Sequence, residues 1–161
     1  MSWDYIEEIL LSLRLPEKFI KWVMTYVRTP VYSIMINGNP EGFFKGACGI
    51  RQGVPMSSLM FVLVMEYPSR SLKQVEDKEF DFHSGCKKLR INHMCFADGL
   101  FIICKANLKS VNIIAIILGD FHKASCLGVN TNKSCVYFYG VSIENRDQLL
   151  NVWDSLKVSY L

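Results

Sequence analysis

The sequence predicts an α+β fold in which antiparallel hairpins pack on helices. Three observations carry this prediction. Apolar residues recur at helical spacing in several segments, an Asn37-Gly38 pair divides two strand-like runs, and a second hairpin pattern surrounds Asp98. Helices and hairpins alternate without the regular strand–helix–strand order of a parallel sheet, which is typical of the α+β class. No repeat or linker divides the 161 residues, so we expect one domain over 1–161.

Two helices open the chain. Apolar residues at helical spacing predict the first from Trp3 to Leu13, and Leu15-Pro16 ends it. Pro16 suits the first turn of the second helix, because an N–H at that position has no intrahelical acceptor. The second helix should end at Thr29-Pro30, since a residue before proline avoids the helical region.

A β-hairpin is predicted next, with strands at 31–36 and 42–45. Asn37-Gly38 is a strong signal for a tight turn between strands, although Asn39-Pro40 can widen it. A loop rich in small residues then covers 46–55.

The helix after this loop should be the most deeply buried one. Ser57 or Ser58 can cap its start, it reaches about Val75, and its middle, 59–65, is apolar on every side. A proline inside a helix costs about 3 kcal/mol and kinks it, so Pro68 predicts a bend or break over 66–68.

The second half of the chain carries another hairpin, with strands at 89–96 and 100–104 and a carboxylate, Asp98, at its turn. We expect an amphipathic helix over 108–121 with a stop signal at Leu127-Gly128, then a strand over 135–141 and a last helix from Asn145 toward Trp153.

The composition excludes intrinsic disorder, because 50% of the residues are hydrophobic and only 20% are charged. It also argues against a membrane span. The longest apolar runs, 59–65 and 113–118, are far shorter than the roughly 20 residues that a bilayer requires. Residues 1–4 lack the basic segment of a secretory signal, so we expect an intracellular protein of the nucleus or cytoplasm that has no membrane partner.

Six cysteines are expected to be reduced thiols that pack as small hydrophobes. His93 and Cys95, with Cys86 and Cys104 nine residues to either side, are the nearest approach to a metal cluster. Zinc ligands usually pair two to four residues apart, so this spacing disfavours a zinc site.

The net charge of +3 is compatible with nucleic acid but does not argue for it. Lys87, Lys88 and Arg90 form a small basic cluster. A solvated face is the simpler interpretation, and weak, non-specific contact with nucleic acid is the alternative.

Several motifs resemble the reverse transcriptase domain of plant non-LTR, LINE-type retroelements. Residues 49–58, G-I-R-Q-G-V-P-M-S-S, are similar to the family's G-[LI]-R-Q-G-D-P-L-S-P. Residues 96–99, F-A-D-G, are similar to F-A-D-D, and Gly128 to Ser134 is similar to G-L-x-x-N-x-x-K-S. The segments 15–22, 65–67 and 86–89 also match in order and spacing, so the resemblance covers nearly the whole chain.

The resemblance implies a partial polymerase palm that binds an RNA or DNA template-primer and two Mg²⁺ ions. Asp98 would be the surviving metal ligand at the hairpin tip. Arg51, Gln52 and Gly53 would lie along the template and nucleotide, and Lys133 would stand near the triphosphate. Phe96 would also belong to the nucleotide- and template-binding residues, and its ring would support the hairpin tip by packing.

Departures from the family pattern predict a catalytically inactive fragment. Gly99 replaces the second hairpin aspartate, Val54 replaces the acidic residue of the loop, and Ser58 replaces its closing proline. By the family's spacing, the other metal-binding aspartate, the fingers and the thumb fall outside these 161 residues. One expected carboxylate of three remains, and losing ligands that act as a unit costs several orders of magnitude in rate.

An alternative function stays open: a non-catalytic fragment that binds nucleic acid or a protein through uncovered apolar surface. The β-rich, uncharged run 100–104 would form an exposed strand edge if the strand that normally lies beside the Asp98 hairpin is missing, and such edges promote aggregation.

Overall fold

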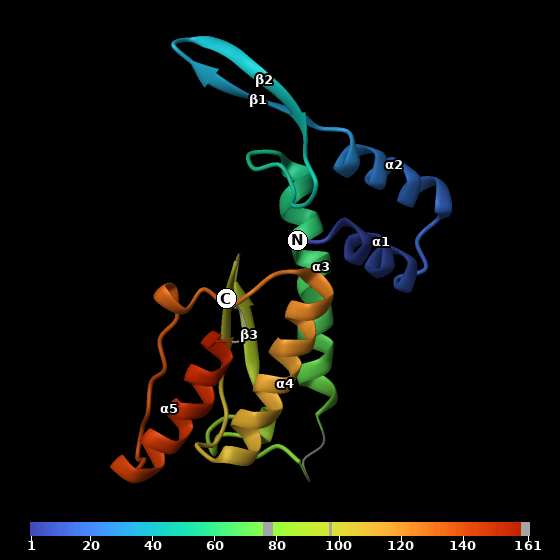
Figure 1. The fold of residues 1–161 in the computed structure, drawn as a ribbon. Helices are drawn as coiled ribbons and strands as arrows, with labels where there is room; N and C mark the ends of the chain where they lie inside the picture. Colours follow the sequence, from blue (N-terminus) through green and yellow to red (C-terminus); the bar gives the residue numbers. More distant parts are fainter. Residues whose placement is uncertain (76–78, 97, 159–161) are drawn as a thin grey trace. The chain divides into compact units, whose positions relative to one another are not determined.

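The computed structural model describes residues 1–75, 79–96 and 98–158, and it confirms the α+β class (Figure 1). The elements in chain order are α1 (Trp3–Ser12), α2 (Glu17–Arg28), β1 (Val31–Ile36), β2 (Asn39–Lys45), α3 (Pro55–Gln74), the 3-10 turn η1 (Lys87–Leu89), β3 (His93–Phe96), β4 (Gly99–Ile102), α4 (Leu108–Ser125), the 3-10 turn η2 (Thr131–Lys133) and α5 (Ile143–Val158). None of the helices in these ranges is both long and apolar enough to cross a membrane.

The chain divides into two compact units, Met1–Val64 and Met65–Leu161, with the boundary inside α3. Each unit is described by itself below. The expectation of one domain over 1–161 stays a prediction.

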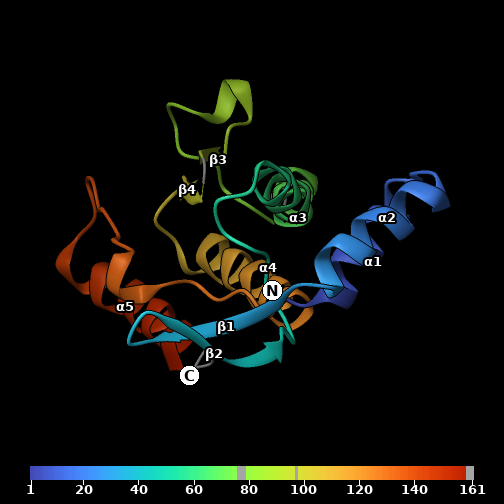
Figure 2. The same ribbon diagram turned by 90° about the horizontal axis from the view of Figure 1, so that it is seen from above.

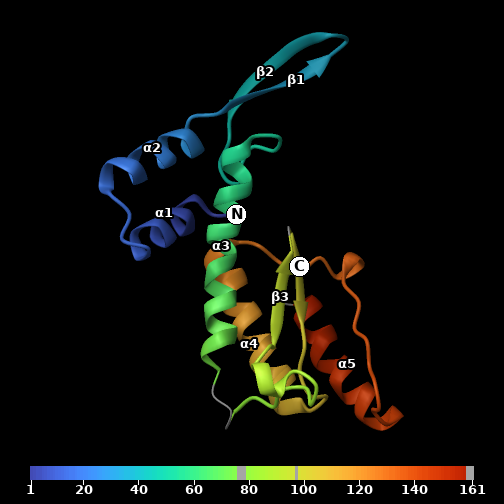
Figure 3. The same ribbon diagram turned by 180° about the vertical axis from the view of Figure 1, so that it is seen from behind.

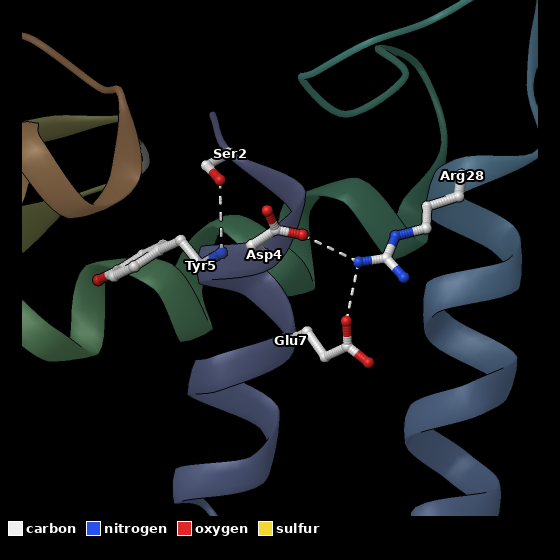
Figure 4. Close-up of polar contacts among 5 residues, drawn as sticks. All are labelled: Ser2, Asp4, Tyr5, Glu7 and Arg28. Carbon is white, nitrogen blue, oxygen red and sulfur yellow. Dashed lines mark hydrogen bonds and ion pairs between the residues drawn. The ribbon is translucent and has the colours of Figure 1, made fainter.

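In the first unit, α1 and α2 pack side by side through buried aliphatic residues, among them Ile6, Leu10 and Val23. Figure 4 shows the polar contact between the same helices. The Arg28 guanidinium lies 3.1 Å from an Asp4 carboxylate oxygen and 2.8 Å from one of Glu7. These groups are solvent-exposed, so the contact orients the helices more than it stabilises them.

The β1–β2 hairpin turns through two residues, Asn37 and Gly38, which both have positive φ (49° and 85°). This geometry suits a two-residue turn between twisted strands, so the expected widening of the turn is wrong. The return strand consequently begins at Asn39, earlier than predicted. Gly42, at φ 61°, occupies an irregularity in the pairing, where two residues of β2 oppose one of β1.

Helix α3 begins at Pro55, earlier than the predicted serine caps, because proline is preorganised for the first helical position. Its middle is buried on one side only: Met60 and Val64 are buried, whereas Leu59 and Val62 are exposed. The prediction of a deeply buried helix on all sides is therefore wrong.

Of the expected bend or break at Pro68, the break is absent, since α3 runs helically from Pro55 to Gln74, and the bend stays a prediction. Proline has no N–H to donate to the carbonyl four residues earlier, which here belongs to Val64. The Tyr5 hydroxyl, from α1, donates to this buried carbonyl oxygen over 3.2 Å. A side chain from another helix thus replaces the hydrogen bond that Pro68 removes.

The second unit packs the C-terminal part of α3, the β3–β4 hairpin and α4 around one core, and Figures 2 and 3 show these elements side by side. Its buried side chains are Leu72, Val75, Phe80, Phe82, Ile114 and Leu118. Leu100 and Ile102 project from β4 onto this core. The described strands form two separate two-stranded sheets, β1–β2 and β3–β4.

Two expectations for the C-terminal part need correction. Helix α4 ends at Ser125 and is capped by Cys126, which is in the left-handed conformation with φ 56°, before the predicted Leu127-Gly128 stop. Residues 135–141 form no strand, because they pair with no neighbour in the described chain and Tyr137 and Tyr139 lie in solvent. A strand depends on a partner for its hydrogen bonds, which residue preference alone does not supply.

Asn107 should be the residue on which the start of α4 depends. Its Oδ1 accepts from the Ser110 backbone N–H (2.8 Å), and its Nδ2 donates to Asp81 Oδ2 (2.6 Å). We expect Asn107→Ala to lower the free energy of unfolding by about 1–2 kcal/mol, since it removes an N-cap and a side-chain contact. Asn112→Ala, at an exposed position within the same helix, is the matched control and should be neutral or slightly stabilising. Equal effects of the two changes in urea denaturation would contradict this role.

Candidate nucleic-acid and metal site

The loop at 46–55 is fixed to the N-terminal segment of the chain. The Trp3 indole N–H donates to the Gly49 carbonyl over 2.8 Å, and the Gly49 N–H donates to the Met1 carbonyl over 2.8 Å. A Cβ at Gly46 would lie 3.0 Å from the Tyr32 ring and 3.6 Å from that of Trp3. The loop therefore depends on a glycine at 46 for its close approach to two aromatic rings.

The residues predicted to lie along a template, Arg51, Gln52 and Gly53, are all exposed at the end of this loop. Gly53 has a φ of 79°, a conformation that favours glycine. The Ser57 hydroxyl donates to the Arg51 carbonyl and so joins the loop to the first turns of α3. The loop presents one cationic and one amide side chain to solvent directly before a helix.

Asp98 lies in the turn between β3 and β4 and is exposed, which confirms its predicted place at a hairpin tip. Residue 97, which belongs to the same motif, lies outside the described residues. Phe96 is 88% exposed, so the expectation that it supports the tip by packing is wrong. In the β3–β4 register Phe96 pairs with Gly99, which offers no side chain to pack against.

Gly99 stands where the resemblance expects a second carboxylate. A Cβ at this position would lie 3.2 Å from the Phe96 carbonyl oxygen. Any side chain at 99 would therefore require a small shift of the hairpin backbone.

The base of this hairpin is held to α3 by a chain of polar contacts. Asn92 is buried, and its Nδ2 donates to the Leu72 carbonyl. The Oδ1 of the same side chain lies 2.7 Å from His93 Nδ1. His93 Nε2 in turn lies 2.7 Å from the Ser69 hydroxyl. Since an amide Oδ1 can only accept, His93 carries its proton on Nδ1 and Ser69 donates to Nε2.

Burial, together with the positive charge of Lys73 on α3, lowers the pKa of His93 below its usual value. Burial raises the pKa of the Cys95 thiol and raises that of Cys104 to about 11. These thiols are therefore protonated at neutral pH. A cysteine that binds a metal ion, in contrast, does so as a thiolate.

The six cysteines are free, as the sequence predicts. Their expected burial is wrong. Cys86 and Cys104 are half-buried, and the other four are exposed.

Lys133 ends the short turn η2, and its N–H donates to the Asn130 carbonyl over 3.1 Å. Its side chain is exposed, and in the described part of the chain it forms no ion pair with Asp98. Arg90, from the basic cluster, lies with its guanidinium carbon 5.5 Å from the Phe82 ring centroid, while Lys87 and Lys88 are exposed on η1.

The predicted site residues fall in both units: Arg51, Gln52 and Gly53 in the first, and Phe96, Asp98 and Lys133 in the second. The expectation that Asp98 faces the loop stays a prediction. Sequence reasoning missed the supporting contacts of Trp3 and Asn92. The reason is that a lone polar or aromatic residue in an apolar context gives no signal for the partner that it contacts.

The comparison with known families identifies the class of protein. The profile of the family described as "Reverse transcriptase (RNA-dependent DNA polymerase)" matches residues 1–161. The chain therefore belongs to the reverse transcriptase family. Over 66 residues it is 33% identical to an uncharacterized mitochondrial protein of Arabidopsis thaliana. The aligned segment covers 40% of this chain and 54% of that protein. The chain thus spans about half the length of this curated relative.

The family implies divalent metal ions, and the donors present do not fit a two-metal site. Asp98 is the one carboxylate of the described hairpin tip, and its neighbour Gly99 has no side chain. The described residues contain no group of three or more His, Cys, Asp or Glu side chains that could hold a metal ion. Mg²⁺ gives up its water reluctantly, so one exposed carboxylate is a poor anchor for it.

We expect the stability of the second unit to depend on the protonation of His93. Because its pKa is lowered in the folded state, the unfolded chain binds the proton more readily. Stability should therefore be complete above the ordinary histidine pKa of about 6.5 and fall as the pH drops below it.

Urea unfolding between pH 7.5 and 5 measures this dependence. His93→Gln should flatten the part of the pH profile below about 6.5, and His83→Gln, at an exposed position on the same segment, is the control. A pH profile of His93→Gln that parallels the parent protein would contradict this assignment.

Proposed function

We propose that this chain is the palm portion of a non-LTR, LINE-type retroelement reverse transcriptase, of plant type, that contacts an RNA or DNA template-primer without extending it. The family match supports the polymerase ancestry. The finer type is supported by the motifs at 49–58, 96–99 and 128–134, which occur in the family's order.

The observation that carries the loss of activity is the hairpin tip. Two-metal polymerases position the attacking and leaving oxygens between two ions, which carboxylates hold close together. Here Asp98 is exposed and Gly99 follows it, so the tip contributes one carboxylate where the motif has two. Lys133 and Arg51 can still neutralise phosphates, because both are exposed cations.

A second candidate function, that of a non-catalytic interaction fragment, is favoured by the β1–β2 hairpin. All the residues of both strands are exposed, including Ile34, Met35 and Phe43. Isolated two-stranded hairpins are marginally stable in water, so covering these side chains would stabilise the hairpin.

Primer extension tests the proposal. We expect no extension of oligo(dT) on poly(rA) with Mg²⁺ or Mn²⁺, because one carboxylate at the tip cannot position both ions. An active polymerase of the same family, assayed in parallel, controls for the substrate. Extension above background that Asp98→Ala abolishes would contradict the proposal.

A further inference from the structure

Helix α2 carries a solvent-facing stripe that its packing does not explain. Its buried side is made of Ile20, Val23, Met24 and Val27. On the opposite side, residues spaced by three or four positions share one face of the helix. These residues are Lys18, Lys21, Trp22 and Thr25, and all four are exposed. We refer to them as the Trp22 stripe.

Trp22 is the unusual member of this stripe. Its side chain is 62% exposed, and the Lys18 ammonium nitrogen lies 5.2 Å from the centroid of its ring. Tryptophan is large and apolar, so it is highly buried on average in folded proteins. Exposed tryptophans with neighbouring cations are typical of surfaces that bind a partner.

The charge of the stripe indicates what kind of partner it fits. It has two lysines, and one exposed carboxylate, Glu17, lies four residues before Lys21 at the start of the helix. Neither lysine forms an ion pair within the part of the chain that the structure describes. Arg28, the other cation at the end of α2, differs because Asp4 and Glu7 already neutralise it. The positive charge available on α2 is therefore concentrated beside the exposed indole.

We propose that the Trp22 stripe binds single-stranded nucleic acid, with a base stacked on the Trp22 indole and neighbouring phosphates contacted by Lys18 and Lys21. An indole provides a flat stacking surface for any base, and lysines supply charge that is independent of sequence. Duplex nucleic acid fits less well, because its bases are already stacked on one another. An acidic protein would use the lysines but would not need the indole face.

The Trp22 stripe shares no residue with the loop at 46–55 or with the Asp98 hairpin. It requires no metal ion and no polymerase activity. Failure of the proposal would therefore leave the proposed function standing, and the reverse also holds.

Fluorescence anisotropy of labelled dT20 with the full chain tests the proposal. Trp22→Ala should raise Kd about tenfold, which is the usual effect of losing one base–aromatic stack. Trp22→Phe should retain part of the affinity, since phenylalanine still stacks. The double change Lys18→Gln with Lys21→Gln should reduce the log–log salt slope by about 1.4, because single strands contribute roughly 0.7 per phosphate contact.

The matched control is Lys87→Gln with Lys88→Gln, which removes the same charge from the exposed turn η1. In this background Trp22→Ala should raise Kd by the same factor as in the parent protein. Circular dichroism checks that each variant is folded, and quenching of tryptophan fluorescence by dT20, lost in Trp22→Ala, gives a second readout. Equal affinity of the parent and Trp22→Ala for dT20 would overturn the proposal. Competition by poly-glutamate as effective as that by unlabelled dT20 would also overturn it and indicate an acidic protein partner.

Discussion

The hydrogen bond from the Tyr5 hydroxyl to the Val64 carbonyl is the contact on which the first unit depends most. Pro68 leaves this carbonyl without its helical donor, and the site is buried, so water cannot replace the donor. A buried carbonyl without a partner costs about 1–3 kcal/mol, a large share of the roughly 5–15 kcal/mol that stabilises a whole domain. The contact allows α3 to continue through a proline and fixes α1 against it.

The position of the candidate loop depends on this contact through α1. Trp3, two residues before Tyr5 on α1, holds the Gly49 carbonyl, and the Met1 carbonyl accepts from the Gly49 N–H. Where α1 is fixed, the loop that carries Arg51 to Gly53 is fixed as well. In the second unit, the hydrogen bond from Asn92 to the Leu72 carbonyl holds the hairpin that carries Asp98 to α3.

Sequence patterns predicted the parts of this fold that depend on local preference. Helical spacing located α1, α2 and α4 to within a few residues, and Asn37-Gly38 located the first hairpin. Prediction failed where a partner distant in sequence decides. Residues 135–141 have strand-forming side chains but pair with no strand among the described residues. Pro68 was expected to bend or break α3, which instead continues through it with the Tyr5 hydroxyl bound to the Val64 carbonyl. Asp98 was placed correctly, because a motif marks a position in a turn, whereas the exposure of Phe96 depends on what lies around that turn.

A double-mutant cycle on Tyr5 and Pro68 tests the central claim most directly. Tyr5→Phe removes only the hydroxyl, and in the parent chain it should lower the free energy of unfolding by about 1–3 kcal/mol. Pro68→Ala restores an N–H for the Val64 carbonyl, so Tyr5→Phe in that background should cost less than about 0.5 kcal/mol, since the carbonyl keeps a donor. Urea denaturation of the four proteins gives the coupling energy between the two substitutions. A coupling energy of about 1 kcal/mol or more would agree with this account. Additive effects of the two substitutions would contradict it, because they would show that the tyrosine hydroxyl does not compensate for the proline.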